Sequence, residues 1–294
     1  MTLLAQAGLM VMAALSPVWP GAIESRPAQQ PAVAKIFVDP PAAAPSRRPE
    51  AIEPVITASN ALLLDLPSGQ VLYEKDADKP RPIASLTKLM TAVVVVEHAK
   101  GDEVVTVPKL TNSNMESLMG IHEGDQVKVD DLLAGLLLSS GNDAADALAV
   151  HVSGSKEDFI KLMNDRAQAI GLTSTHFSTP SGFDKGESFS TARELSTISR
   201  AAIAQPRISA LTGHKELTVT ALNGPQYQLK TTDQLIGGYL PVAGLKTGTT
   251  DEAGPCLISL LGGDRRLLAV VLNSPDRFQE NKSMLDWALH SHTW

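Results

Sequence analysis

The sequence predicts an α+β fold in which strands from the two ends of the domain share one antiparallel sheet, with a helical subdomain inserted between them. Three observations support this prediction: a hairpin pattern at residues 61–74, helical spacing of apolar residues between 85 and 170, and short apolar runs after residue 242. Strands that are distant in sequence need a common core to hide their apolar faces. We therefore expect the first and the last strands to belong to the same sheet.

Strands are predicted at both ends of this domain. Near its start, the runs 61–65 and 70–74 flank a Pro-Ser-Gly turn, which is typical of a β-hairpin. In the last third, short apolar runs at 242–249, 256–261 and 267–272 are separated by Gly-rich or charged turns. Apolar runs of this length, bounded by turn residues, are typical of buried strands.

Four regions are predicted to be helical. Apolar residues recur with helical spacing from Ser85 to about His98, and again in a largely buried region, 131–152, which Ser-Ser-Gly interrupts. Helical spacing from 159 to 170 ends at a glycine, a common C-terminal cap. Residues 276–290 are expected to form a closing helix.

The N-terminus resembles a secretory signal. Residues 3–19 are almost wholly apolar and uncharged, and serine, proline and glycine residues between 16 and 21 break the run. Residues 1–22 are therefore expected to be a signal peptide or an N-terminal anchor, and the protein is expected to be exported to the periplasm or cell envelope. The run is short for a membrane span, and no Lys or Arg precedes it, unlike a usual signal. A buried N-terminal helix is the alternative.

A linker and one folded domain are expected to follow. Residues 23–56 are rich in Pro and Ala, a composition that buries too little apolar area to order itself, which favours an extended linker. The remaining residues, 57–294, are expected to form the domain. With 43% hydrophobic residues, a chain of 294 residues can bury a substantial core.

Charge and cysteine content exclude some classes of partner and bond. The net charge of −7 is spread without clusters of Lys and Arg, so no nucleic-acid surface is expected. The single cysteine, Cys256, cannot form an intramolecular disulfide. It lies in an apolar run and is expected to be a thiol packed in the core.

Ser85 and Lys88 are the first candidates for chemistry. Residues three apart lie on one face of a helix, so the hydroxyl and the amine can come within hydrogen-bond distance. A serine is a poor nucleophile until a base accepts its proton, and a lysine does this when burial or another cation lowers its pKa. The alternative is an N-cap serine followed by a solvated lysine.

Two further polar motifs lie next to apolar sequence. Residues 140–142, Ser-Gly-Asn, must satisfy their hydrogen bonds locally, and they could relay a proton and hold a substrate amide; a plain loop turn is the alternative. Residues 246–249, Lys-Thr-Gly-Thr, end a predicted strand, where a lysine and a hydroxyl could bind a substrate carboxylate. The glycine would let a substrate backbone approach the strand edge. An exposed strand end is the alternative for this motif.

The three motifs occur together in the order Ser-x-x-Lys, Ser-x-Asn and Lys-Thr-Gly. From residue 60 to the C-terminus the chain resembles the penicillin-binding protein and serine β-lactamase superfamily, and more narrowly the D-alanyl-D-alanine carboxypeptidases of the S11 type. The stretches 171–177 and 253–254 also support the resemblance. It implies a β-lactamase/transpeptidase-like fold and a catalytic domain at 57–294 that acts on peptidoglycan stem peptides. β-Lactam antibiotics would be inhibitors, and no metal or cofactor is expected.

The resemblance implies a role for each motif residue. Ser85 would attack the carbonyl between the two terminal D-alanines, Lys88 would be the general base, and Ser140 would relay the proton to the leaving amine. Water would then hydrolyse the acyl-enzyme. The residues implied in substrate binding are Asn142, on the substrate amide or on Lys88; Lys246 and Thr247, on the terminal carboxylate; Gly248, along the substrate backbone; and Thr249, whose N–H would form an oxyanion hole with that of Ser85.

Arg193 matches an arginine that lies near the site in this family, and a structural ion pair is the alternative reading. The chain departs from the family pattern at Ile83, where a proline usually precedes Ala-Ser. It also departs at 231–235, Thr-Thr-Asp-Gln-Leu, where the family often has Asn-Thr-Asn-x-Leu, and this departure bears on the substrate contacts. The chain ends one helix after the last predicted strands, so any membrane attachment is expected through the N-terminus only.

Three other functions fit parts of this pattern. A class A β-lactamase would need a deacylating glutamate after Asn142, and Glu157, Glu187 and Glu194 lack the Glu-x-x-Leu-Asn context. A D-alanyl-D-alanine endopeptidase, which cuts peptidoglycan cross-links, would use the same residues as a carboxypeptidase. A non-catalytic peptidoglycan-binding module would have no need of both Ser85 and Lys88. The residues alone leave carboxypeptidase and endopeptidase open.

Overall fold

The computed structural model of the protein describes residues 43–109, 116–184 and 186–294. The predicted signal or anchor, 1–22, and the first part of the predicted linker, 23–42, lie outside the described residues. Within the described ranges no helix has the length and apolar character needed to cross a membrane.

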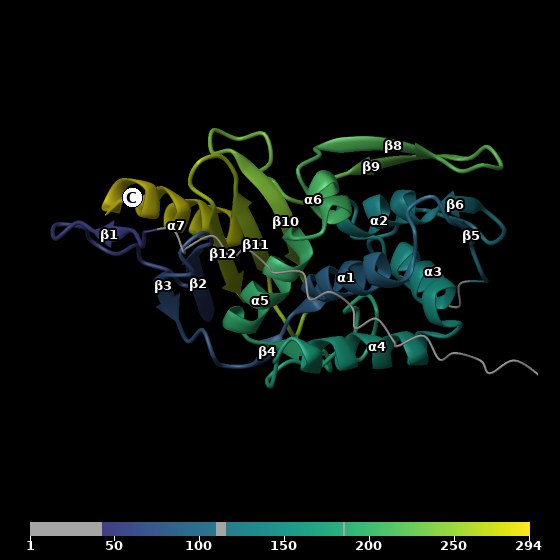
Figure 1. Cartoon of the computed structure of the whole chain (residues 1–294), viewed down its shortest axis with the longest axis horizontal. Helices are drawn as coiled ribbons and strands as arrows, with labels where there is room; N and C mark the ends of the chain where they lie inside the picture. Colours follow the sequence, from purple (N-terminus) through teal and green to yellow (C-terminus); the bar gives the residue numbers. More distant parts are fainter. Residues whose placement is uncertain (1–42, 110–115, 185) are drawn as a thin grey trace, which may run out of the picture. The chain divides into compact units, whose positions relative to one another are not determined.

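The fold is built on a five-stranded antiparallel sheet with the order β10-β11-β12-β2-β3 (Figure 1). β12 pairs with β2 from Leu267 opposite Asp65 to Leu272 opposite Asn60. This pairing joins the beginning and the end of the domain in one sheet, as predicted. The strands are β2 (Asn60–Asp65), β3 (Val71–Lys75), β10 (Val242–Gly248), β11 (Cys256–Leu261) and β12 (Leu267–Leu272).

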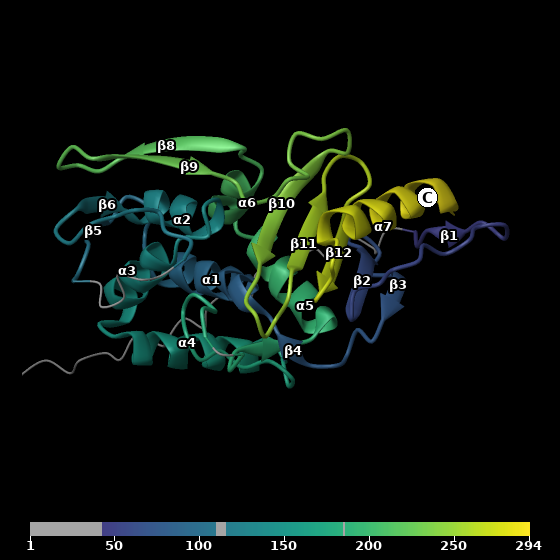
Figure 2. The ribbon, with the colours of Figure 1, turned by 180° about the vertical axis from the view of Figure 1, so that it is seen from behind.

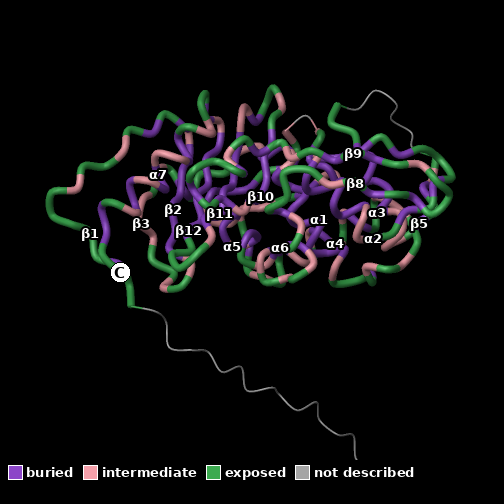
Figure 3. Tube along the Cα trace, turned by 90° about the horizontal axis from the view of Figure 1, so that it is seen from above, coloured by how far each residue is buried: buried purple, intermediate pink, exposed green. Residues whose placement is uncertain are grey.

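Side chains of the central strands alternate between two cores, one on each face of the sheet. In β2, Leu62 and Leu64 belong to the core shared with the helical subdomain, whereas Ala61 and Leu63 belong to the core shared with α7 (Arg277–Ser291). This alternation is the two-residue period of a strand. Because both faces are covered, β2, β11 and β12 are buried along their whole length and have apolar sequences nearly throughout (Figure 3).

The helical subdomain follows β3 and is arranged around α1 (Lys88–His98). A 3₁₀ turn, η1 (Ala84–Thr87), leads into α1, so the helix predicted from Ser85 begins with a tighter turn. Figures 1 and 2 show α1 between α2 and α4, and α1 contacts both helices. The other helices are α2 (Val129–Leu137), α3 (Asn142–Ser153), α4 (Lys156–Ala169), α5 (Ala192–Ile203) and α6 (Pro206–Thr212). The break between α2 and α3 falls at the predicted Ser-Ser-Gly sequence.

Four short antiparallel pairs surround the sheet and helices. They are β1 (Ser46–Arg47) with β13 (His292–Thr293), β4 (Arg81–Pro82) with β7 (Phe189–Ser190), β5 (Val104–Thr106) with β6 (Gln126–Lys128), and β8 (Glu216–Thr220) with β9 (Gln226–Lys230). In the first pair, β1 lies within the predicted linker, 23–56, and pairs with the C-terminal strand β13. Ile56, inside the predicted linker, is 5% exposed and belongs to the core against α7. The overall composition of a linker does not reveal that one of its apolar residues packs against the domain.

Candidate active site

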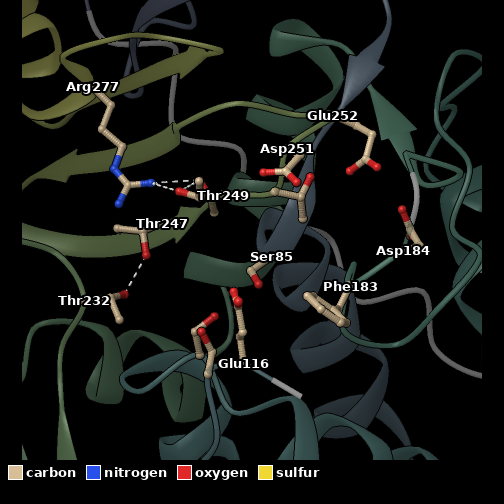
Figure 4. Close-up of a pocket in the computed structure, with 14 residues that line it drawn as sticks. Ser85, Glu116, Phe183, Asp184, Thr232, Thr247, Thr249, Asp251, Glu252 and Arg277 are labelled. Carbon is tan, nitrogen blue, oxygen red and sulfur yellow. Dashed lines mark hydrogen bonds between the residues drawn. The ribbon is translucent and has the colours of Figure 1, made fainter. Parts of the chain in front are cut away.

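A pocket of about 640 Å³ collects the predicted motifs at the end of β10 (Figure 4). Ser85 of η1, Ser140 from the α2–α3 connection, and Thr247 of β10 all line it. The remaining lining residues are Glu116, Ser117, Phe183, Asp184, Thr232, Gly248, Thr249, Thr250, Asp251, Glu252 and Arg277. Three segments that are far apart in the sequence therefore meet at one pocket, as the motifs predicted.

Lys88 lies in hydrogen-bond contact with Ser85. Its Nζ is 2.8 Å from Ser85 Oγ, 2.7 Å from Asn142 Oδ1 and 2.7 Å from the backbone oxygen of Ser181. Lys88 is 0% exposed, and this burial, with Lys246 as a second cause, holds the pKa of its amine well below the usual value. A neutral amine has two N–H groups, which Asn142 and Ser181 can accept. Its lone pair is then free to take the proton of Ser85.

Asn142 connects this lysine to the loop at residues 116–121. Its Oδ1 accepts from Lys88, and its Nδ2 donates to the backbone oxygen of Glu116 at 2.6 Å. Of the two contacts expected for Asn142, the structure shows the one with Lys88. Asp143 holds the same loop, because its carboxylate accepts the N–H groups of Met119, Gly120 and Ile121 at 2.8, 2.7 and 3.1 Å.

Backbone strain is concentrated at the pocket. Five described residues other than glycine have positive φ, and three of them, Ala84 (48°), Ser117 (57°) and Ser140 (58°), line the pocket or precede Ser85 directly. Such conformations cost on the order of 1–3 kcal/mol each and persist only when the surrounding packing determines them. The strain is consistent with a site whose side chains are held in place before a ligand binds.

Gly182 lies against the η1 turn that carries Ser85, and a side chain at this position is expected to destabilise the fold. Its φ is +69°, and an added Cβ would lie 2.0 Å from the backbone oxygen of Ala84 and 2.5 Å from Thr87 Oγ1. We expect Gly182→Ala to lower the free energy of unfolding by about 3 kcal/mol, since backbone strain and overpacking add. Gly171→Ala is the control, because Gly171 has a similar φ of +80° with no atom within 4 Å. Equal losses for the two variants in urea unfolding would contradict the predicted clash.

Lys246 is buried at the end of β10. It is 1% exposed, and its Nζ donates to the backbone oxygen of Thr247 at 3.0 Å. Burial, followed by the charge of Arg277, lowers the pKa of Lys246 to about 7, while Asp233 acts in the opposite direction. Thr247 Oγ1 is 2.6 Å from Thr232 Oγ1 at the pocket wall.

Gly248 allows β10 to approach the candidate nucleophile. An added Cβ would lie 3.0 Å from the Ser85 backbone nitrogen and 3.1 Å from the Ile83 backbone oxygen. The sequence predicted room for a substrate backbone here, and the structure adds contact with the backbone of η1. The N–H groups at the start of a helix lack partners within that helix, so the Ser85 N–H is suitably placed for an oxyanion.

Arg277 lines the pocket although no motif in the sequence points to it. It is the first residue of α7, and its Nη1 donates to the backbone oxygen of Gly248 at 2.8 Å and to Thr249 Oγ1 at 2.6 Å. The charge of this side chain reaches the pocket because α7 packs on the sheet next to β11. No local sequence signal relates the first turn of a closing helix to the end of β10.

The structure does not bring Arg193 to the pocket. Its Nε donates to Asp78 Oδ1 at 2.7 Å and its Nη2 to Glu74 Oε2 at 2.5 Å, and these bonds raise the pKa of the guanidinium. Arg193 is not among the pocket residues, so the structure corrects the predicted substrate contact to the alternative, an ion pair on the surface.

The glutamates considered for a β-lactamase lie elsewhere. Glu194 accepts the backbone N–H groups of Thr173 and Ser174, and neither Glu157 nor Glu187 lines this pocket. The glutamates of the pocket are Glu116 and Glu252. In the part of the chain that the structure describes, no group of three or more His, Cys, Asp or Glu residues is arranged to hold a metal ion.

Comparisons with known proteins agree with this geometry. A model of the D-alanyl-D-alanine carboxypeptidase family, Peptidase_S11, matches residues 47–276. The chain is 40% identical over 253 residues to D-alanyl-D-alanine carboxypeptidase DacC of Escherichia coli. The matched region covers 80% of this chain and 62% of that protein. The chain spans about three fifths of the length of this relative and of two other curated carboxypeptidases, between 61% and 63% of each.

Solved structures show the same fold. A variant of the Streptomyces K15 DD-transpeptidase is similar with a TM-score of 0.77 and 30% identity, over 81% of this chain and 100% of that one. Penicillin-binding protein D2 from Listeria monocytogenes, in a cefotaxime-bound form, is similar with a TM-score of 0.72 and 33% identity, over 81% and 99% of the two chains. These similarities confirm the predicted β-lactamase/transpeptidase-like fold class.

Proposed function

Because this chain belongs to the D-alanyl-D-alanine carboxypeptidase family, we propose that it is a serine-type carboxypeptidase that removes the terminal D-alanine from peptidoglycan stem peptides through an acyl-enzyme on Ser85. The observation that carries the proposal is the 2.8 Å contact between Ser85 Oγ and the buried amine of Lys88. A binding module would have no need of a nucleophile with a base of lowered pKa beside it.

In the proposed acylation, Lys88 accepts the proton of Ser85 as its Oγ attacks the carbonyl of the penultimate D-alanine. Ser140, which is 4% exposed and lines the pocket, relays this proton from Lys88 to the leaving amine as the C–N bond breaks. The N–H groups of Ser85 and Thr249 stabilise the oxyanion, where charge appears only in the transition state. Water then attacks the ester carbonyl and gives a proton to Lys88, the ester C–O bond breaks, and Lys88 returns the proton to Ser85 Oγ.

Lys246, Thr247 and Arg277 are the proposed ligands of the terminal carboxylate. The two cations lie at the same end of β10 as Thr247, and Arg277 and Thr247 line the pocket. Asn142 acts on Lys88, and Gly248 keeps β10 close to the attacking serine. The same cations would receive the carboxylate of a β-lactam. The cefotaxime-bound relative supports β-lactam binding as such.

The substrate class also implies a location. Peptidoglycan lies outside the cytoplasmic membrane, so the proposed activity on its stem peptides requires export to the periplasm or cell envelope. The apolar, uncharged run at residues 3–19 supports this proposal as a candidate export signal.

The proposed function is tested by incubating the purified domain with a fluorescent penicillin and, separately, with muropeptides, and measuring the masses of the products. A label on Ser85 together with loss of one D-alanine supports the carboxypeptidase. A label with conversion of cross-linked dimers to monomers would point to the endopeptidase instead. Absence of any label would reject the acyl-enzyme and favour the binding module.

Lys246→Met is expected to raise KM for a stem peptide and to slow acylation by about 10- to 100-fold, because a charged hydrogen bond to the carboxylate contributes roughly 1.5–3 kcal/mol. Methionine retains most of the buried volume. Lys230→Met, on a side chain that is 75% exposed in β9, is the matched control. The loss should vanish for a peptide whose terminal carboxylate is amidated. An unaltered acylation rate with the free carboxylate would contradict the role of Lys246.

A further inference from the structure

The loop between β9 and β10 carries a carboxyl group that the proposed reaction does not use. Asp233 stands where the family pattern often has asparagine, and it is 5% exposed. Its neighbour Thr232 lines the pocket and shares a 2.6 Å hydrogen bond with Thr247. The loop therefore buries a carboxyl group next to the wall where the substrate carboxylate is proposed to bind.

Only one oxygen of Asp233 has a hydrogen-bond partner. Oδ1 accepts from the Leu235 N–H at 2.9 Å, whereas Oδ2 is buried and has no partner within the described ranges. A buried carboxylate oxygen without a partner is costly unless nearby charge stabilises it. Burial raises the pKa of Asp233, and the charges of Lys246 and Arg277 act in the opposite direction.

Asp233, Lys246 and Arg277 thus form a cluster of one acidic and two basic groups. Neither basic group lies within 4.0 Å of a carboxylate oxygen of the described residues. Lys246 instead donates to a backbone oxygen, and Arg277 donates to backbone oxygens and a hydroxyl. Asp233 therefore compensates the positive charge of Lys246 and Arg277 without an ion pair to either. It leaves their contact with a ligand carboxylate open.

We propose that Asp233 is the counter-anion of this carboxylate-binding subsite: it favours the protonated form of Lys246 and opposes the negative charge of the bound ligand. This inference rests on the proposed function, since it takes Lys246 and Arg277 as the groups that bind the substrate carboxylate. Asp233 acts through Lys246 and does not touch the reacting atoms. It is a positioning residue for charge.

Asp233 affects binding of the ligand carboxylate in two opposite ways. It favours binding by keeping Lys246 protonated, it opposes binding by repelling the carboxylate, and each effect is strongest at a different pH. At the acidic end of the pH range, below its pKa of about 7, Lys246 of the wild type is protonated. As long as Lys246 also stays protonated in the variant, removing the anion removes only its repulsion of the ligand carboxylate. Above pH 7, Lys246 loses its proton, and without Asp233 this loss begins at lower pH. The other charged groups that face Lys246 are Arg277 on α7 and Lys88 on α1, and neither changes in the variant.

The test is Asp233→Asn, which removes the charge and keeps the side-chain shape. The second-order rate of Ser85 acylation by a penicillin is measured by intact mass from about pH 5.5 to 9. We expect the variant to be about threefold faster at the acidic end and about tenfold slower at the alkaline end, so the two profiles cross. Asp264→Asn, in the exposed turn between β11 and β12, makes the same chemical change away from the cluster and should follow the wild-type profile.

Two further measurements make the result specific. A D-alanyl-D-alanine peptide amide lacks the carboxylate, and its turnover should show no crossing between wild type and Asp233→Asn. Asp233→Ser removes the charge with a smaller side chain and should cross in the same way, which covers the case in which the asparagine variant folds poorly. Parallel profiles with an unchanged midpoint, in protein that is labelled on Ser85, would overturn the role of Asp233. Wild-type protein that is never labelled would overturn the proposed function instead.

Discussion

Ser85→Ala is expected to abolish covalent labelling by penicillin and to lower D-alanine release by a factor on the order of 10⁴–10⁶, while the protein stays folded. The variant removes the only atom of Ser85 that can form the ester. The Lys88 amine keeps its contacts with Asn142 and Ser181 at 2.7 Å each, so the cluster around it is retained. The expected change in the free energy of unfolding is within about 1 kcal/mol, since one hydrogen bond is lost.

The measurement is the intact mass of the protein after incubation with penicillin, together with thermal unfolding of each variant. Ser139→Ala is the matched control, because Ser139 precedes the Ser-Gly-Asn motif and does not line the pocket. It should be labelled as completely as the wild type. A label that persists in Ser85→Ala would show that another residue is the nucleophile and would reject the proposed assignment.

Lys88→Met is expected to slow acylation by at least about 10³-fold without collapse of the site. Methionine has a similar length and tolerates the full burial of this position, where the lysine is 0% exposed. The variant loses the base, and Asn142 and Ser181 each lose a donor. Leaving those two acceptors without a donor destabilises the fold. Replacing a buried amine by an apolar group offsets part of this loss.

The pH dependence of acylation separates a lost base from a damaged fold. In the wild type, Lys88 is protonated below its pKa and cannot accept the serine proton, so the acylation rate should fall as the pH falls through that value. Burial lowers this pKa, so the active, neutral form is present at lower pH than for a solvated lysine. In Lys88→Met this acidic limb should disappear. An acidic limb that is unchanged in the variant would assign the base to another group.

The sheet and the motif residues could be predicted because each has a strong local signal. β11 and β12 are short apolar runs between turns, and their predicted bounds match the structure. The three motifs identified Ser85, Lys88 and Lys246, and the structure brings these residues to the pocket or directly behind it. In this chain, the residues with the clearest chemistry are also those that the fold places together.

Other features depend on contacts that a linear pattern does not contain. β8 and β9 expose most of their polar residues and bury mainly Val219, Tyr227 and Leu229, which is a weak alternation over five residues each. Arg193 matches the family by sequence, yet the carboxylates of Glu74 and Asp78 bind its guanidinium on the surface. Arg277 reaches the pocket only because α7 lies against the sheet. Its position is a consequence of tertiary packing.

The place of β2 between β12 and β3 determines when during synthesis the protein can become active. β2 leaves the ribosome early, but its neighbour Leu267–Leu272 is made near the end of the chain, and β10 joins the sheet only through β11 and β12. Until those residues have emerged, β2 has one edge without a partner and the Lys-Thr-Gly strand has no support. The five-stranded sheet that holds the Lys-Thr-Gly strand close to Ser85 therefore forms only once nearly the whole domain has been synthesised.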